Sequence, residues 1–146
     1  MNNNRKELKI FSILILALVA LTVVKAIVSI CMNGIPQPTE IPEGMTKELA
    51  QIITVITFAL SFVVLIPQIY VGVKGLMVAN GAASGKAHIV WALLLAIAAG
   101  VSVFSGISDL TKAVNLDTVF NLIGYVADLA VFGFYYVYAL KVKNEN

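Results

Sequence analysis

The stretch IFSILILALVALTVV, residues 10–24, contains no charged side chain and decides the fold class of this chain. It lies inside a longer apolar segment, about 8–32, in which Lys25 interrupts the apolar run near the far end. A helix rises ~1.5 Å per residue, so this segment is long enough to cross the ~30 Å hydrocarbon core of a bilayer. Its apolar residues are continuous rather than alternating, which favours a membrane helix over a strand of a lipid-facing barrel.

Three more segments of this kind follow, at about 49–78, 87–110 and 119–140. The composition agrees, because 60% of the 146 residues are hydrophobic and only 12% are charged. A single soluble domain of this size has too little interior to bury so much apolar surface. We therefore predict an all-α membrane protein, a single domain over residues 1–146, with four transmembrane helices in an up-down-up-down bundle.

The charges at the segment ends predict the orientation in the membrane, since basic residues collect on the cytoplasmic side. One side of the predicted bundle carries Arg5, Lys6, Lys9, Lys74, Lys86, Lys141 and Lys143. The other side carries only Lys47 and Lys112, beside five acidic residues. Aromatic side chains that suit a membrane interface fall near the first side: Tyr70, Trp91, Tyr135, Tyr136 and Tyr138. We predict a multi-pass protein of the cell membrane with both termini in the cytoplasm.

The first segment also permits a second interpretation, because a basic start followed by an apolar core is typical of a cleavable signal peptide. Val28-Ser29-Ile30-Cys31 is similar to a lipoprotein cleavage site, but Ile30 is not the small residue expected before the cysteine. The apolar run is also long for a signal core. We expect the first helix to be retained.

Two ionisable residues lie inside the predicted spans, where such groups are costly and often functional. Lys25 and Asp128 both fall in the half of the membrane away from the termini, at depths of ~10 Å and ~15 Å. The first and last helices of such a bundle are neighbours, so we predict a buried ion pair between Lys25 and Asp128. Alternatively, Lys25 extends to the interface, and Asp128 is protonated or serves in transport or a proton relay.

Polar side chains also recur on helical faces. Asn121 and Tyr125 share a face with Asp128, because these residues are three or four positions apart. Ser61 and Ser102 contribute to similar stripes on the second and third segments. Such stripes either line a wet cavity or form hydrogen bonds between dry helices. The third segment also carries small residues that permit close helix contact, within one chain or between copies: Ala92, Ala96, Ala99, Gly100, Ser102 and Gly106.

Pro67 and Gln68 lie within the second segment. Proline removes a backbone donor and bends a helix, so we predict a hinge at these two residues. The continuation through Gly72 and Gly75 is expected to be tilted or interfacial, because the whole segment is longer than the hydrocarbon core requires.

We expect no enzyme activity, cofactor or metal, since no catalytic or ligand motif is present. Cys31 is alone, which excludes an intrachain disulfide. His88 is the only histidine and suits a polar anchor at the interface. The run GAASGKAH, residues 81–88, differs from a nucleotide-binding loop in its glycine spacing and lacks a preceding strand. The net charge of +2 leaves no basic surface for nucleic acid.

The segment from Gly72-Val-Lys-Gly-Leu through Lys86-Ala-His-Ile-Val-Trp91 resembles small, uncharacterised four-helix membrane proteins of Gram-positive bacteria. Those proteins pair a glycine- and lysine-bearing end of the second helix with a short turn and a third helix that starts near a tryptophan. The resemblance implies this architecture and a bacterial source, and it implies no activity.

Ile66-Pro67-Gln68-Ile69 is similar to the PQ-loop signature of half-transporters for sugars and amino acids. The resemblance implies a three-helix bundle in which the proline lets a helix rock and Asn121 faces the substrate. The chain departs from that family in its longer loop after Gln68, in the missing serine- and glycine-bearing continuation and in its additional first helix.

The preferred functional prediction is an accessory or structural subunit, or a homo-oligomer, that acts through helix contacts. Its partners are then the lipid bilayer and either another membrane protein or a second copy. The alternative is a small-solute carrier that uses Pro67, Gln68, Asn121 and Asp128. A polar cavity that reaches the middle of the membrane distinguishes the carrier, and a dry core distinguishes the accessory protein.

Overall fold

The computed structural model describes residues 2–145 as five α-helices and contains no strand within that range. The helices are α1 (Asn3–Asn33), α2 (Lys47–Ser61), α3 (Leu65–Ala79), α4 (Ala87–Lys112) and α5 (Leu116–Asn144). With α2 and α3 taken together, four helical stretches are long and apolar enough to cross a membrane. The all-helical class and the four candidate membrane segments are therefore confirmed.

Pro67 divides the second membrane segment into α2 and α3. A proline at this position has no N–H to donate to the carbonyl of Val63, and its ring crowds that carbonyl. The chain instead forms a tight turn at residues 62–64, where the N–H of Ile66 donates to the Val63 carbonyl at 3.2 Å. Helix α3 starts at Leu65, so Pro67 lies in its first turn, where proline is tolerated. The bend predicted at Pro67 thus lies one turn earlier.

Helix α3 packs along α1 and is part of the bundle. Its buried residues include Val71, Gly72, Gly75 and Val78. The expectation that this continuation is tilted or interfacial stays a prediction, since packing against α1 does not fix its depth in a membrane. The two glycines leave room for α1, so this stretch buries its small face against another helix.

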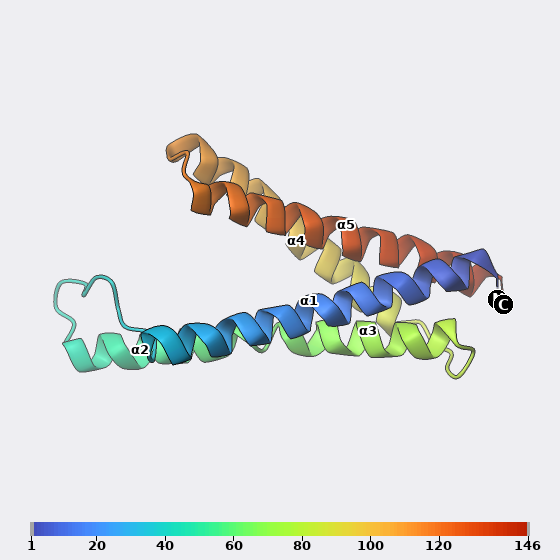
Figure 1. Ribbon diagram of the computed structural model, residues 1–146, viewed down its shortest axis with the longest axis horizontal. Helices are drawn as coiled ribbons and strands as arrows, with labels where there is room; N and C mark the ends of the chain where they lie inside the picture. Colours follow the sequence, from blue (N-terminus) through green and yellow to red (C-terminus); the bar gives the residue numbers. More distant parts are fainter. Residues whose placement is uncertain (1, 146) are drawn as a thin grey trace.

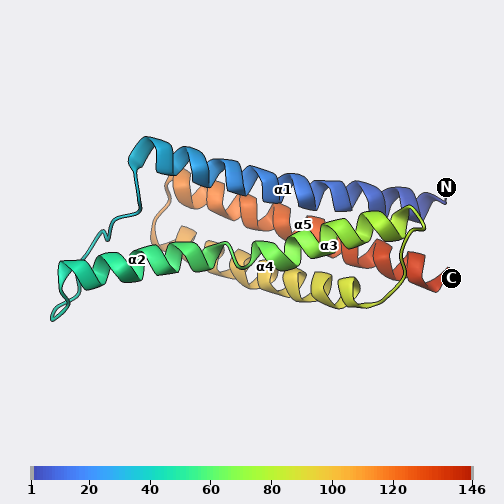
Figure 2. The same ribbon diagram turned by 90° about the horizontal axis from the view of Figure 1, so that it is seen from below.

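Both termini and the α3–α4 loop lie at the same end of the molecule (Figures 1 and 2). We call this the closed end, because α1 packs against both α3 and α5 there. Phe11 of α1 stacks on Phe134 and Tyr138 of α5, with ring centroids 5.5 and 5.7 Å apart. Buried residues concentrate here: those of α1 end at Val19, and those of α5 begin at Phe132.

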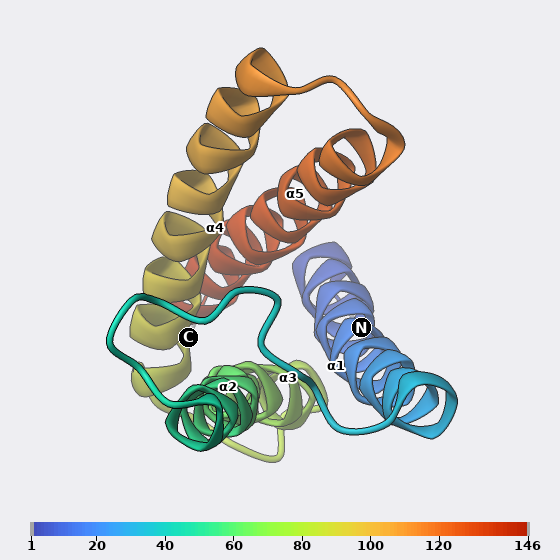
Figure 3. The ribbon, with the colours of Figure 1, turned by 90° about the vertical axis from the view of Figure 1, so that its left-hand side faces the viewer.

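Toward the other end, which carries residues 34–46 and 113–115, the helices diverge as two arms (Figures 1 and 3). One arm consists of α1 and α3 with α2, which separates from α1 toward this end (Figure 2), and the other consists of α4 and α5. We call this the open end. The arms therefore contact each other mainly near the termini.

Small residues bring α4 and α5 together along their length. Ala92, Ala99 and Gly106 recur every seven residues on α4 and are buried, which is the spacing of a coiled-coil seam. A Cβ atom on Gly106 would lie 3.0 Å from Tyr125 and 3.2 Å from Leu122 of α5. Gly106 thus serves a contact within one chain, a choice that the sequence left open for the small residues of this helix.

Candidate functional site: a polar junction at the closed end

Four helices meet around the hydroxyl group of Tyr135, which lies fully buried on α5. This hydroxyl donates a hydrogen bond to the backbone carbonyl of Val71 on α3 at 2.9 Å. It also lies 2.7 Å from Nδ1 of His88 on α4. The single hydroxyl proton is used by the carbonyl, so Nδ1 of His88 must carry a proton and donate it to the Tyr135 oxygen. The pairing therefore sets which nitrogen of the imidazole is protonated.

Glycine on α3 makes this approach possible. A Cβ atom on Gly75 would lie 2.5 Å from the hydroxyl oxygen and Cε2 of Tyr135, and it would also collide with Oγ of Ser12 on α1. Ser12 is fully buried, and its hydroxyl donates to the carbonyl of Leu8 at 2.7 Å. We call the set Ser12, Val71, Gly75, His88 and Tyr135 the polar junction, since it joins one residue or more from each of α1, α3, α4 and α5.

The polar junction is suited to holding helices in place. His88 is only 1% exposed, and its ring meets the Tyr135 ring edge to face, with centroids 6.0 Å apart. Paired polar groups inside a protein fix one arrangement, because breaking the pair leaves buried groups unsatisfied. Among residues 2–145 there is no group of three or more His, Cys, Asp and Glu side chains that would hold a metal ion.

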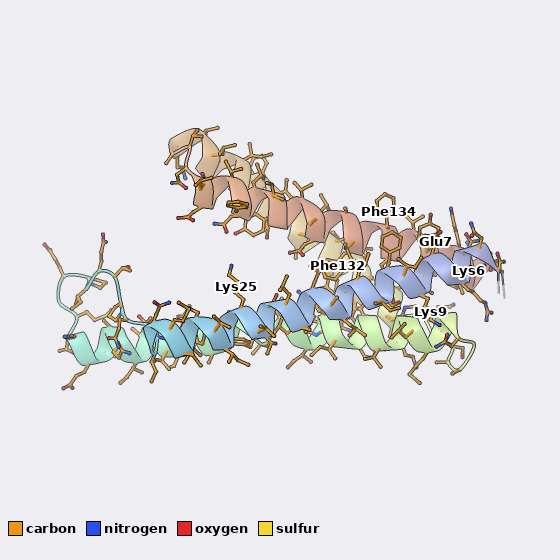
Figure 4. All side chains as sticks on the ribbon, in the orientation of Figure 1. Lys6, Glu7, Lys9, Lys25, Phe132 and Phe134 are labelled. Carbon is orange, nitrogen blue, oxygen red and sulfur yellow. The ribbon has the colours of Figure 1, made fainter. Side chains whose placement is uncertain are left out.

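Lys25 and Asp128 lie outside the polar junction. Lys25 is exposed on α1, and its side chain points toward the side of the molecule where α4 and α5 lie (Figure 4). It lines a depression of about 260 Å³ between α1 and α2, together with Phe58 and Ser61. Asp128 is half-buried on α5. The structure shows no ion pair between Lys25 and Asp128 in the residues that it describes, and Lys25 is exposed rather than buried, so the predicted buried pair is not formed in this arrangement.

The predicted polar stripes do not converge. Asn121 and Ser61 are exposed, whereas Tyr125 and Ser102 are half-buried. The hydroxyls of Ser61 and Ser102 donate to carbonyls of their own helices, at 2.6 and 3.1 Å. Tyr125 packs instead over Gly106. Within residues 2–145 no hydrogen bond connects these four side chains to one another.

The predicted hinge residues lie at the start of α3. Pro67 lines a surface depression of about 230 Å³ with Ile66, Tyr70 and Trp91. Gln68 is half-buried beside it. A hinge function of this pair stays a prediction, and the turn at residues 62–64 is the local break that would serve it.

The polar junction itself was missed by sequence reasoning. His88 was expected at the interface and Tyr135 among the interfacial aromatic residues, but both are buried. The physical reason is that Gly75 leaves space for the Tyr135 ring, which then meets a carbonyl and an imidazole that satisfy its hydroxyl. The available signal was the pair of glycines three residues apart, Gly72 and Gly75, which marks one face of a helix for close approach.

No protein-family model matches this chain, and neither a characterised protein nor a solved structure gives a match. The functional conclusion therefore depends on the geometry of the chain itself.

Proposed function

We propose that this protein is a non-enzymatic accessory or structural subunit of the cell membrane, which acts through helix contacts at its open end. The observation that supports this proposal is the distribution of burial. No residue of α1 after Val19 is buried, no residue of α5 before Phe132 is buried, and α2 has Ala50 alone. Half of the bundle thus offers helix faces that the chain does not cover.

The charges at the open end favour a protein partner over lipid. Lys25 and Asp128 are costly when they face hydrocarbon, and they do not pair with each other in the arrangement described. Polar groups on a neighbouring membrane helix satisfy such residues, whereas acyl chains have none to offer. The proposed occupant is a helix of another membrane protein or of a second copy.

The proposed orientation places the closed end, with both termini, in the cytoplasm. Seven basic residues belong to the closed end and its flanks, as the positive-inside rule requires. Helix α1 is proposed to be retained, because Leu8 and Ile15 belong to the hydrophobic core. The resemblance to small four-helix membrane proteins of Gram-positive bacteria fits this architecture.

Site-specific photocrosslinking in host membranes tests the proposal. A photoreactive amino acid at position 25 should give one discrete heavier species, a covalent dimer or an adduct with one other polypeptide. The same amino acid at position 27, on the opposite face of α1, should give lipid adducts only. If position 25 also gives lipid adducts alone, the open end has no protein partner and the proposal fails.

A small-solute carrier of PQ-loop type is the second candidate. The observation that favours it is a molecule closed at one end and divergent at the other, with a helix break directly before Pro67. Counterflow of labelled sugars or amino acids into liposomes that contain the purified protein tests this candidate. Uptake that Asp128→Asn abolishes supports a carrier, and the absence of uptake in the unaltered protein excludes it for the solutes tested.

A further inference from the structure

Two adjoining cavities lie at the closed end, beside the loop of residues 80–86. The first has a volume of about 170 Å³, and its polar lining consists of Ser84, Lys86, His88 and Lys143. The second, of about 450 Å³, is lined by the same loop and by Arg5 of α1. The two cavities share the side chains of Val78, Ala83 and Ser84 as a common wall.

The charged side chains that line the two cavities are basic: Lys86 and Lys143 in the first cavity and Arg5 in the second. Lys86 lies directly before α4, and Lys143 lies near the end of α5. Two segments that are far apart in the sequence thus each bring one lysine to the first cavity. No Asp or Glu lines either cavity among the described residues. Glu145, two positions after Lys143, accepts a hydrogen bond from the side chain of Asn4. An anion is therefore the ligand class that the two lysines of the first cavity attract.

The start of α4 adds to this attraction. The N-cap position of α4 is Lys86, which makes no side-chain hydrogen bond to the first turn. The first N–H groups of a helix carry a partial positive charge and donate hydrogen bonds to an anion that caps them. Gly81 and Gly85, with φ of 76° and 130°, give the loop a backbone shape that other residues rarely adopt.

We propose that the first cavity binds a phosphate group through Lys86 and Lys143, and that the second cavity holds what is attached to it. A volume of about 170 Å³ is below the ~300–1,000 Å³ of pockets that enclose larger organic ligands, so the first cavity by itself has room for a phosphate group and not for the group attached to it. The closed end carries the basic residues of the predicted cytoplasmic face, where anionic lipids place their phosphates. The site shares with the function proposed above only the cytoplasmic orientation of the closed end, and it needs no partner at the open end.

Lipid binding by the full-length protein in neutral detergent tests this site, with native mass spectrometry as the readout. The probes are phosphatidylglycerol, phosphatidylcholine and inorganic phosphate. We expect one phosphatidylglycerol to bind per chain, more tightly than phosphatidylcholine, whose choline neutralises the phosphate. Displacement of phosphatidylglycerol by millimolar inorganic phosphate assigns the site to the phosphate group itself, and resistance to displacement assigns it to the whole lipid headgroup. Failure of phosphatidylglycerol to bind overturns the proposal.

The matched variants separate a built site from general surface charge. Lys86→Gln combined with Lys143→Gln should weaken binding by roughly tenfold to thirtyfold. Lys141→Gln removes one charge from the same end of α5, where Lys141 lies 5.0 Å from the centre of the Tyr138 ring and lines neither cavity. It should change binding by less than about twofold. Lys143→Gln alone, which removes one charge as Lys141→Gln does, should weaken binding by roughly fivefold. Equal losses in these two single variants overturn the proposal.

Ala83→Phe provides a second test, because the larger side chain at the wall shared by the two cavities occupies their space while every lysine is kept. We expect it to abolish binding, and retention of full affinity would show that surface charge alone attracts the lipid. Helix content and gel filtration in detergent establish that each variant is folded. If Ala83→Phe fails to fold, the comparison of the lysine variants decides the matter.

Discussion

Adding a single methyl group at Gly75 tests how closely the helices pack at the polar junction. Gly75→Ala places a Cβ atom 2.5 Å from Tyr135 and against Ser12, so α3 must separate from α1 and α5. We expect the free energy of unfolding to fall by about 1–3 kcal/mol, the usual cost of overpacking. Circular dichroism during titration with dodecyl sulfate in mixed micelles measures it. Gly124→Ala on α5, where nothing lies within 4 Å, is the control and should not destabilise; an equal loss in both variants would contradict the close packing.

Tyr135→Phe keeps the ring and deletes the hydroxyl that His88 and Val71 share. It leaves a buried N–H and a buried carbonyl without their partner, so we expect a loss of about 1–3 kcal/mol in the same unfolding assay. The effect of His88→Leu should be smaller in the Tyr135→Phe background, by about 0.5 kcal/mol or more, because the shared bond is already lost. Tyr136→Phe, at a half-buried neighbour, is the control. Strictly additive losses would mean that the hydrogen bond contributes nothing.

The residues of the polar junction show why burial was hard to predict at this scale. Histidine and tyrosine have an apolar body and a polar tip, so both suit a membrane interface as well as a paired interior site. Hydropathy and helical spacing do not distinguish these two environments. The choice depends on whether another helix supplies a hydrogen-bond partner and enough space, and for Tyr135 these come from α3, sixty-four positions away at Val71.

At the scale of elements, Pro67→Ala tests why α2 and α3 are separate. The substitution restores an N–H for the Val63 carbonyl, so we expect the turn at 62–64 to become helical. Spin labels at positions 52 and 77 in a Cys31→Ser background should then move apart to ~38 Å, the length of a straight helix between them. Electron–electron resonance measures the distance. Gln68→Ala retains the proline and should retain the shorter distance, and an unchanged distance in Pro67→Ala would assign the break to another cause.

The four apolar segments were predictable because the hydrocarbon core demands a long continuous apolar run, which the sequence displays directly. The position of the break between α2 and α3 was not predictable in the same way, since the carbonyl that loses its donor lies four residues before the proline. The divergence of the arms was also not predictable. In a membrane the outside of a helix is as apolar as its packed side, so residues such as Ile13 and Leu14, which are exposed, look like Ile15, which is buried.

At the scale of the whole molecule, Cys31 is a natural probe of the orientation. It is the only cysteine, is exposed and lies near the end of α1 opposite the termini. If the closed end is cytoplasmic, a membrane-impermeant maleimide should label Cys31 in intact cells. A Cys31→Ser, Glu145→Cys variant moves the thiol to the C-terminus and should react only after the cells are permeabilised. The reverse pattern would place the termini outside.

The two arms themselves are tested by the pair that the sequence predicted across them. In the arrangement described, Lys25 and Asp128 form no ion pair, and the proposed partner satisfies each of them separately. For the purified chain in micelles, we therefore expect the stability changes caused by Lys25→Met and Asp128→Asn to add within about 0.5 kcal/mol, as they do for groups that do not interact. Dodecyl sulfate unfolding of the two single variants and the double variant measures this. A larger coupling would mean that the arms close and pair the two charges, and the helix faces at the open end would then be covered by the chain itself, with no partner required.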